Sequence, residues 1–304
     1  MLYKFTGAGN DFVVIDGRKG DVSEFRTVER IGELCREYKT DGLMILLLPS
    51  SSGLSRGSNL DFVMEFYNPD GTGGMMCGNG GRCITAFADM LGLKPAAEDG
   101  TWHFLAPDGP HEAKIIDRSF VATAPQDDNG CHSERPSCHS ERSEESKWIV
   151  RLKMIDVDGV TPMMGGYFLN TGTRHFVKFV DDVDAMDMER DAKPLRWDPA
   201  FQPVGTNVNF VERRPDGLHI RTYEKGVEGE TLACGTGITA SAIASVIDSP
   251  VKPANDEKVP ANDGVHLQCR RGDWLTVEFK KDGQGFKDVY LTGPAELVKT
   301  IELC

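Results

Sequence analysis

Short apolar segments, each ended by a turn residue, dominate the pattern of hydrophobic and polar positions along the chain. They are rich in Val, Ile, Leu and Phe and are bounded by Gly, Asp, Asn or Pro, which is typical of β-strands. On this basis we predict strands over residues 11–16, 43–48, 60–66, 149–155, 175–180, 217–223 and 274–279.

Helical periodicity is less frequent. Apolar positions recur at helical spacing between Val28 and Tyr38, which predicts a helix there. Two further helices are predicted over residues 80–91 and 235–247. Because strands and helices do not alternate regularly, the pattern disfavours a doubly wound parallel sheet. It predicts an α+β protein with a mostly antiparallel sheet.

Two repeats interrupt this pattern. Cys-His-Ser-Glu-Arg occurs at 131–135 and again at 138–142, and Pro-Ala-Asn-Asp occurs at 253–256 and 260–263. The polar composition of residues 127–147 predicts a loop outside the core. Its two Cys-His pairs supply zinc-type ligands, but adjacent Cys and His do not have the usual C-x₂₋₄-C spacing. Sequence duplication explains both pairs without a metal. The four residues concerned are Cys131, His132, Cys138 and His139.

Size and charge narrow the function classes. The chain has 304 residues, enough for one large domain or two of about 150 residues. Its net charge of −13 makes it a poor binder of nucleic acid or anionic membranes. The longest apolar run, Leu43–Leu48, is too short to span a bilayer, and we identify no signal peptide. Eight cysteines are too sparse for a disulfide scaffold, so we expect a cytoplasmic protein with reduced thiols.

An internal repeat of a cysteine motif is the most informative feature. Cys-Gly-Asn-Gly begins at Cys77, ten residues after Tyr67, and Cys-Gly-Thr-Gly begins at Cys234, eleven residues after Tyr223. In both copies a β-like segment ends at Tyr, a polar turn follows, and the motif opens an apolar helical stretch. These matched contexts predict two pseudo-symmetric domains, each of which supplies one cysteine.

The motif has a specific chemistry. Glycine allows a tight strand-to-helix turn and a close approach of ligand to main chain. The free N–H groups and positive dipole end of the helix can hold a carboxylate and lower the pKa of a nearby thiol. Two such cysteines suggest that one thiolate removes a proton from a carbon atom while the other thiol protonates the opposite face. Single buried cysteines are usually small hydrophobes, which is our interpretation of Cys35, Cys83 and Cys269.

Further motifs accompany the two cysteines in a fixed order. They are GAGNDF (7–12), YNPDG (67–71) with MCGNG (76–80), NTGTRHFV (170–177), NVNF (207–210), and YEKG (223–226) with ET (230–231) and ACGTG (233–237). In these motifs, over nearly the whole chain apart from the repeats, the sequence resembles the diaminopimelate epimerase family. The resemblance implies cofactor-independent epimerisation of LL-2,6-diaminopimelate to the meso isomer, in lysine and peptidoglycan precursor biosynthesis. It implies no pyridoxal phosphate and no metal.

The family fold implies two similar domains, each a mostly antiparallel, barrel-like sheet around a central helix, with the active site in the cleft between them. The family's final strand returns to the first domain, which fits residues 288–293. We therefore place the N-terminal domain at residues 1–126 and 286–304, a repeat insertion at 127–147, and the C-terminal domain at 148–285 with a second insertion at about 249–264. The family often forms dimers, so a homodimer is also expected.

The resemblance also implies residue roles. Cys77 and Cys234 form the acid–base pair, and Glu224 and His175 assist beside the reacting α-amino group. The reacting carboxylate is held at the two helix starts by Gly78, Asn79, Gly235 and Thr236. The substrate, mainly its distal end, is bound by Asn10, Asn68, Asn207 and Lys225. Outside their motifs, Asn10, Asn68 and Asn207 would be interpreted as turn or cap residues, and His175 would be interpreted as an ordinary strand histidine.

Three positions depart from the family's usual residues. Lys225 stands where Arg is common, Thr173-Arg174 where Asn-Pro is common, and Asp41-Gly42-Leu43 in a segment that often contains Gln. All three concern substrate recognition. They leave open a proline or hydroxyproline racemase-like enzyme of the same fold. The remaining alternatives are a non-catalytic protein of this fold and a zinc-binding module built on the Cys-His repeat. A zinc site formed by Cys77 and Cys83 would lack a second pair of ligands.

Overall fold

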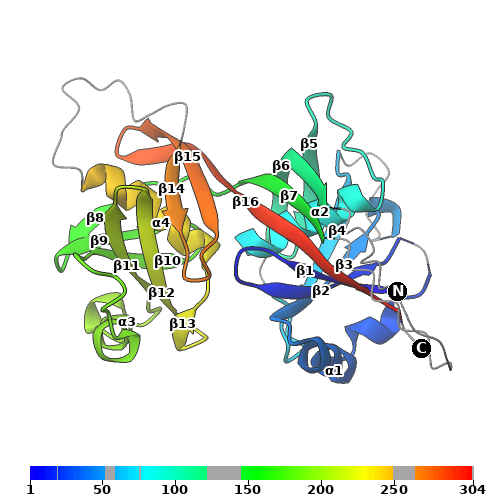
Figure 1. The fold of residues 1–304 in the computed structure, drawn as a ribbon, viewed down its shortest axis with the longest axis horizontal. Helices are drawn as coiled ribbons and strands as arrows, with labels where there is room; N and C mark the ends of the chain where they lie inside the picture. The colour runs from blue at the N-terminus through cyan, green and yellow to red at the C-terminus, as the bar shows by residue number, and fades with distance from the viewer. Residues whose placement is uncertain (19, 52–58, 75–76, 122–144, 249–263, 303–304) are drawn as a thin grey trace, which may run out of the picture.

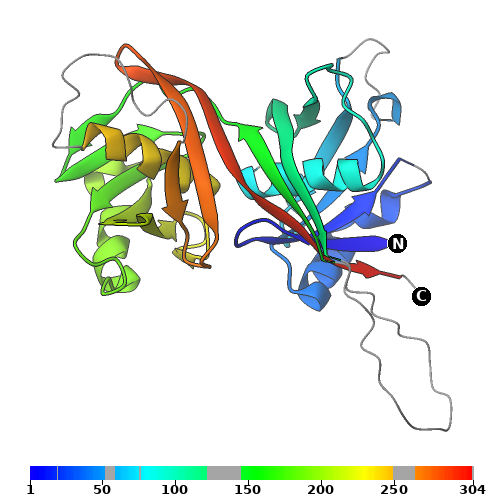
Figure 2. The same cartoon turned by 45° about the horizontal axis from the view of Figure 1, so that its top comes forward.

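The computed structural model describes residues 1–18, 20–51, 59–74, 77–121, 145–248 and 264–302. The Cys-His repeat and the Pro-Ala-Asn-Asp repeat lie outside these residues, as does the zinc alternative that rests on the first of them. The loop predicted over residues 127–147 lies outside them as far as residue 144. The described chain forms two lobes, with the N- and C-terminal ends close together on one of them (Figures 1 and 2).

The N-terminal lobe is a closed eight-stranded barrel. Its strands pair in sequence order, and the last one also pairs with the first, which closes the ring. They are β1 (Leu2–Thr6), β2 (Asp11–Asp16), β3 (Gly42–Leu47), β4 (Phe62–Tyr67), β5 (Thr101–Ala106), β6 (Gly109–Val121), β7 (Glu145–Lys153) and β16 (Gly285–Ile301). Helix α2 (Gly78–Met90) is buried in the barrel along nearly its whole length.

Helix α1 (Val28–Tyr38) covers the opposite face of the same sheet. Alternate residues of β2 show this division: Phe12 and Val14 join the core cluster around α2, whereas Val13 and Ile15 join the cluster under α1. Since successive side chains of a strand point to opposite faces, a strand covered on both sides reads as a continuous apolar run. That explains the uninterrupted apolar sequence of β2.

The C-terminal lobe repeats the arrangement around helix α4 (Gly235–Ile247). Its strands are β8 (Thr161–Met163), β9 (Gly166–Asn170), β10 (Arg174–Phe179), β11 (Asn207–Arg214), β12 (Gly217–Glu224), β13 (Gly229–Thr231), β14 (Val265–Gln268) and β15 (Trp274–Asp282). Short helical segments complete it: α3 (Lys193–Arg196), a π-helical turn (Met188–Ala192) and a 3₁₀ turn (Pro199–Phe201); two 3₁₀ turns, Ser23–Arg26 and Pro49–Ser51, belong to the first lobe.

The two lobes share one order of strand pairing. In the first, β2–β3 and β4–β5 are parallel; in the second, the corresponding pairs are β10–β11 and β12–β14, and the remaining pairs are antiparallel. In each lobe the buried helix connects the two strands of the second parallel pair: α2 lies between β4 and β5, and α4 lies between β12, with its side strand β13, and β14. This confirms the predicted α+β fold of two pseudo-symmetric, mostly antiparallel lobes around central helices.

Strand β16 joins the lobes. Its first half pairs with β15 of the C-terminal lobe, and its second half pairs with β7 and β1 of the N-terminal lobe. In Figure 1 it runs as one red strand from one lobe to the other. The sequence predicts an insertion that extends to residue 147, but β7 begins at Glu145, so residues 145–147 belong to a strand. The exact domain boundaries stay a prediction. Among the helices of the described residues, none is long and apolar enough to cross a membrane.

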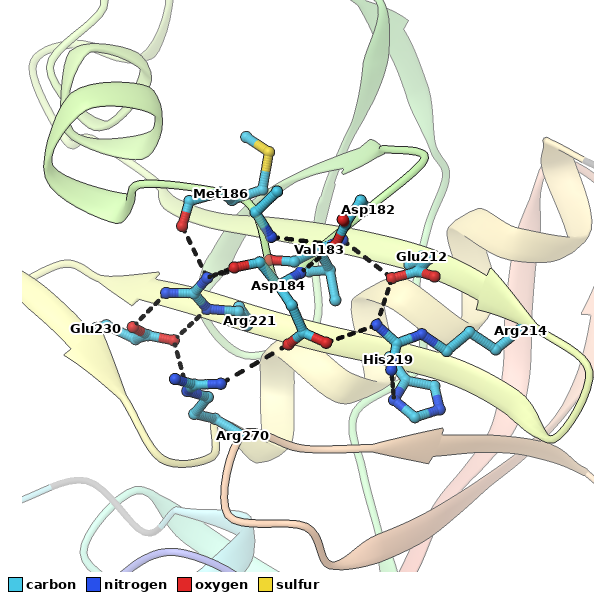
Figure 3. Close-up of polar contacts among 11 residues, drawn as sticks. Asp182, Val183, Asp184, Met186, Glu212, Arg214, His219, Arg221, Glu230 and Arg270 are labelled. Atoms are coloured by element: carbon cyan, nitrogen blue, oxygen red, sulfur yellow. Dashed lines mark hydrogen bonds and ion pairs between the residues drawn. The ribbon is translucent and has the colours of Figure 1, made fainter.

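A charged network fixes the outer face of the C-terminal lobe (Figure 3). The Arg221 guanidinium on β12 donates to both carboxylate oxygens of Glu230 on β13, at 2.6 and 2.8 Å. It also donates to the carbonyl oxygens of Val183 and Met186, at 3.1 and 2.7 Å. The loop after β10 and strand β13 are thereby tied to β12, the strand that ends at Glu224 in the site described below.

Candidate active site

Each central helix begins at a cysteine, as the repeated motif predicts. Cys77 has an extended backbone before α2, and its sulfur accepts a hydrogen bond from the Gly80 N–H at 3.2 Å. Cys234 has an extended backbone before α4, and its sulfur lies 3.4 Å from Thr236 Oγ1 and 3.8 Å from Glu224 Oε1. Both thiols are free. The strand-to-helix turn thus places each sulfur in the first turn of its helix.

The two helix starts meet at their first residues. A Cβ atom built on Gly235 would lie 3.4 Å from the Cα of Gly78, and one built on Gly78 would lie 3.7 Å from the Cα of Gly235. Either Cβ would also press on Leu291 Cδ2, at 3.2 and 3.1 Å. Glycine at both positions therefore lets the two N-termini converge on one point between the lobes.

A cavity of about 320 Å³ opens at this point. Both cysteines line it, so the fold brings together two motifs that are far apart in the sequence. Predicted site residues that line it are Asn10, Cys77, Gly78, Asn79, Glu224, Cys234, Gly235 and Thr236. Other lining residues come from the β5–β6 turn and the start of β6 (Asp108, Pro110, His111, Glu112), the end of β7 and the residues after it (Lys153, Met154, Ile155), the turn after β9 (Thr171, Gly172, Thr173) and Ala233. The cavity is therefore built from both lobes.

Burial governs the acidity of the two thiols. It raises the pKa of the Cys77 thiol, while the Gly80 N–H and the positive charge of Arg82 act in the opposite direction. Burial also raises the pKa of the Cys234 thiol, and the nearby Glu224 carboxylate adds to that rise. The helix-start N–H groups therefore lower thiol pKa as the sequence suggested, but in the ligand-free site desolvation outweighs them. The two cysteines also have different charged neighbours.

Glu224 lies at the end of β12, beside Cys234. It is half-buried and lines the cavity, and burial raises the pKa of its carboxyl. The Cys234 thiol is its hydrogen-bonding neighbour at 3.8 Å. A carboxyl group of raised pKa next to a thiol in a cavity is suited to proton transfer.

His175 lies behind the cavity wall, fully buried on β10. Thr222 donates to Asn209 Oδ1 at 2.9 Å, which turns the Asn209 amide nitrogen toward His175 Nδ1 at 3.0 Å. The other ring nitrogen, His175 Nε2, faces the hydroxyls of Thr236 and Thr173, each at 2.9 Å, and the amide nitrogen of Asn207 at 3.3 Å. Burial lowers the pKa of His175 to about 3, so the ring is neutral. Thr236 in turn is the neighbour of Cys234, which links the imidazole to the cysteine indirectly.

An asparagine pair connects the first turn of α2 to the β1–β2 turn. Asn79 donates to Asn10 Oδ1 at 2.7 Å, and Asn10 donates to Asp41 Oδ2 at 3.2 Å. Asn10 lines the cavity. Its amide group is positioned by Asn79 and Asp41, which come from two other segments.

Asn68, Asn207 and Lys225 are not among the described residues that line the cavity. Asn68 donates to Thr72 Oγ1 at 3.0 Å within the turn after β4. Asn207 is buried, donates to Thr173 Oγ1 at 3.2 Å and accepts from the Lys225 N–H at 2.8 Å. The side chain of Lys225 is exposed. Asn68 thus has a contact within its own turn, whereas Asn207 contacts Thr173, His175 Nε2 (3.3 Å) and the Lys225 N–H.

The sequence analysis missed several residues of the site. Thr171 donates to the carbonyl oxygen of Thr236 at 2.8 Å, and the Asn209 amide nitrogen lies 3.0 Å from His175 Nδ1. The period-two spacing of Asn207 and Asn209 on one strand places both on the same face, and this signal could have revealed Asn209. The β5–β6 turn and the end of β7 carry no motif. Within the described ranges there is no cluster of His, Cys, Asp and Glu that could hold a metal ion.

Comparisons with known proteins agree with this geometry. A family model described as diaminopimelate epimerase matches residues 167–298. A diaminopimelate epimerase from Flavobacterium psychrophilum is 34% identical over 301 residues, which cover 98% of this chain and 97% of that protein.

Solved structures share the fold. A phenazine biosynthesis protein of the PhzF family from Bacillus anthracis matches with a TM-score of 0.64 at 13% identity, covering 100% of this chain and 98% of that chain. A hydroxyproline epimerase from Agrobacterium vitis matches with a TM-score of 0.52 at 15% identity, covering 99% and 90%. At these identities the likeness concerns the fold alone.

Proposed function

This chain belongs to the diaminopimelate epimerase family, and on that premise we propose that it converts LL-2,6-diaminopimelate to meso-diaminopimelate with two cysteines and no cofactor. Members of the family are epimerases, so the chain is an enzyme of the isomerase class. The observation that carries the proposal is the meeting of two cysteine-led helix starts at one cavity. The product would serve lysine and peptidoglycan precursor biosynthesis.

In the proposed mechanism Cys77 and Cys234 act from opposite sides of the substrate α-carbon. One thiolate removes the α-proton and becomes a thiol, while the opposite thiol donates its proton to the other face and becomes a thiolate. Atoms and charge balance, and the two roles exchange for the reverse reaction. Both sulfurs line the cavity, one from each lobe, which supports this arrangement.

The reacting carboxylate would lie at the two helix starts. The main-chain N–H groups there belong to Gly78, Asn79, Gly235 and Thr236, all of which line the cavity. Removing the α-proton places negative charge on the carboxylate oxygens. Fixed N–H groups aimed at these oxygens stabilise that charge without reorganising, as an oxyanion hole does. The absence of a β-carbon at both glycines supports this role because it leaves the main chain open to the ligand.

Glu224 and His175 would assist from the C-terminal lobe. Glu224 lines the cavity 3.8 Å from Cys234 and would pair with the reacting α-ammonium group. His175 is separated from the cavity by Thr236, so we propose that it acts through the Thr236 hydroxyl rather than on the substrate. It thereby fixes the position of Cys234.

The distal end of the substrate would be bound by Asn10, Asn68, Asn207 and Lys225. Asn10 already lines the cavity. Asn68 and Asn207 would have to exchange their present hydrogen bonds with Thr72 and Thr173 for bonds to the ligand. The exposed amine of Lys225 is free to turn toward a distal carboxylate, because no ion pair of the described residues engages it.

A substrate comparison tests the proposal. Purified enzyme would be given LL-diaminopimelate, L-proline and trans-4-hydroxy-L-proline in parallel, and inversion would be followed by chiral chromatography. The proposal predicts inversion of diaminopimelate alone. Inversion of either imino acid without inversion of diaminopimelate would overturn the substrate assignment, and inversion of none would overturn the proposed activity.

A further inference from the structure

Arg82 is a fully buried cation inside the N-terminal lobe. Its side chain is 0% exposed and lies in the second turn of α2, five residues after Cys77. Its guanidinium donates to four neutral oxygens: the carbonyls of Gly78 (3.1 Å), Gly7 (3.3 Å) and Pro294 (3.3 Å) and the side-chain oxygen of Asn79 (2.8 Å). None of the ion pairs of the described residues includes it. The hydrogen bonds are satisfied, but the charge is not.

The corresponding position of the other central helix carries no charge. In α4 the position five residues after Cys234 is Thr239, which is also fully buried. Its hydroxyl donates to the carbonyl of Gly235 at 3.0 Å, as the Arg82 guanidinium donates to the carbonyl of Gly78 at 3.1 Å. The pseudo-symmetric contact is therefore kept while the cation is not. This difference breaks the equivalence of the two helix starts.

A buried cation without a counter-anion favours a negative charge nearby. The groups that interact with Arg82 and could carry one are Cys83, Cys77, Cys269 and Asp273. Asp273 already pairs with Arg271 at 3.5 Å. Cys83 and Cys269 are buried hydrophobic-core residues. Cys77 is the partly exposed thiol of the set, and its sulfur already accepts an N–H hydrogen bond. It directly precedes Gly78, whose carbonyl accepts from the Arg82 guanidinium at 3.1 Å.

Cys234 faces the opposite electrostatic situation. The charged group beside it is the Glu224 carboxylate, which disfavours a second negative charge. Glu224 also acts on Cys77, in the same unfavourable direction, but there it is opposed by Arg82. The two sulfurs therefore differ in their charged neighbours. Cys77 is influenced by both Arg82 and Glu224, whereas Cys234 is influenced by Glu224 without a compensating cation among the described residues.

We propose that Arg82 is a positioning residue that makes Cys77 the more acidic thiol of the cysteine pair, so that Cys77 carries the thiolate and Cys234 the thiol whenever one of the two is ionised. This rests on the proposed function for its catalytic meaning. The isomer whose α-hydrogen faces Cys77 then meets the singly ionised enzyme in its reactive form. After one inversion the thiolate is on Cys234, and the free enzyme returns to that form by exchanging one proton with water at each sulfur.

The test is the pH dependence of alkylation of each cysteine by iodoacetamide in the ligand-free enzyme, resolved by peptide mass spectrometry. Since only thiolates react, the midpoint of each rate profile reports the ionisation of that thiol. The wild-type enzyme is expected to show a lower midpoint for Cys77 than for Cys234. A reversed order, or equal midpoints, would overturn the proposal without any variant.

Three variants separate charge from packing. Arg82→Gln should slow Cys77 alkylation roughly tenfold below its midpoint, because losing a nearby opposite charge raises a pKa by about one unit or more. Arg82→Lys keeps the charge and should keep the midpoint. Thr239→Val removes the corresponding bond in α4 without a change of charge and should leave both midpoints in place. A folded Arg82→Gln enzyme with an unshifted Cys77 midpoint would contradict the proposal.

The two proposals fail separately. Alkylation needs no substrate, so an enzyme with the expected midpoints but no epimerase activity would refute the proposed function and leave the role of Arg82 intact. An active enzyme with the reverse order of midpoints would do the opposite. If Arg82→Gln does not fold by circular dichroism, the wild-type order of the midpoints still decides.

Discussion

Gly78 and Gly235, the first residues of the two central helices, touch across the boundary between the lobes: a Cβ on Gly235 would lie 3.4 Å from the Cα of Gly78. The two helix dipoles therefore present their positive ends at one place. The cysteines that precede these glycines flank the same cavity. A carboxylate bound there would accept N–H bonds from both lobes, and its α-carbon would lie between the two sulfurs.

Substitution of Gly235 tests the importance of this contact. Gly235→Ala should lower kcat/KM by about tenfold or more, because its methyl group must displace Leu291 or Gly78, and small misplacements of reacting groups cost large factors in rate. The measurement is steady-state epimerisation of diaminopimelate. Gly229→Ala is the matched control, since a Cβ there meets nothing within 4 Å. Equal activity of the two variants would show that the close approach is dispensable.

Glu224→Gln should separate activity from stability. The variant loses the carboxylate beside Cys234, and we expect a rate loss of roughly 10²-fold or more, typical of a proton-transfer group. At neutral pH it should nevertheless melt at a higher temperature than the wild type. Burial raises the pKa of Glu224, so its ionised form is the one that folding disfavours.

The sign of this effect sets its pH window. The folded-state pKa lies above the unfolded value, so the stability contributed by protonated Glu224 is fully present below the unfolded pKa and is lost as pH rises through the folded pKa. The melting temperatures of wild type and variant should therefore converge toward about pH 4. A gap that stays constant from acid to neutral pH would show that Glu224 does not titrate as its burial requires.

Thr236→Val tests the indirect role of His175. The substitution keeps the main-chain N–H but removes the hydroxyl between His175 Nε2 and the Cys234 sulfur, at 2.9 and 3.4 Å. A loss of about tenfold in kcat is expected, equivalent to one hydrogen bond of about 1.4 kcal/mol. His175→Gln in the Thr236→Val background should then add little. Fully additive losses would mean that His175 acts independently of Thr236.

Lys225→Ala should raise KM for diaminopimelate by about tenfold while leaving thermal stability unchanged, because an exposed surface lysine contributes little to folding. Lys225→Arg should keep or improve binding, since it retains the charge and adds a bidentate fork for a carboxylate. Unchanged kinetic constants in Lys225→Ala would show that the distal carboxylate is bound elsewhere in the cavity.

Much of the fold could be predicted from apolar periodicity and the repeated cysteine motif. The strand predicted at residues 11–16 and the helix at 235–247 match β2 and α4 residue for residue, and residues 80–91 differ from α2 only at the ends. Strand β16 was predicted only as a short segment. The first half of its 17 residues packs in one lobe and the second half in the other, so the neighbours change along the strand and no single hydrophobic period marks it.

The site was less accessible to sequence reasoning. The two cysteines could be found because each glycine-rich helix start has a local signature. Asn207 and Asn68 have signatures as well, but their side chains bond to nearby turns, which a motif does not distinguish from ligand contact. Arg82 and Thr239 show the limit most clearly, since only their packing reveals that one helix start holds a buried charge and the other does not. The homodimer, the cytoplasmic location and the lack of nucleic-acid binding stay predictions.

The central claim is that two cysteines invert one α-carbon by removing and replacing its proton from opposite faces. Epimerisation of LL-diaminopimelate in D₂O tests it most directly, with the product analysed by mass spectrometry and NMR for the wild type, Cys77→Ala and Cys234→Ala. We predict that the wild-type product carries one solvent deuterium at the inverted α-position, and that each folded variant loses roughly 10²–10⁴-fold or more in inversion rate. Inversion at a near-normal rate by either single variant, or an inverted product that keeps its original α-hydrogen in the first turnovers, would contradict the two-cysteine account.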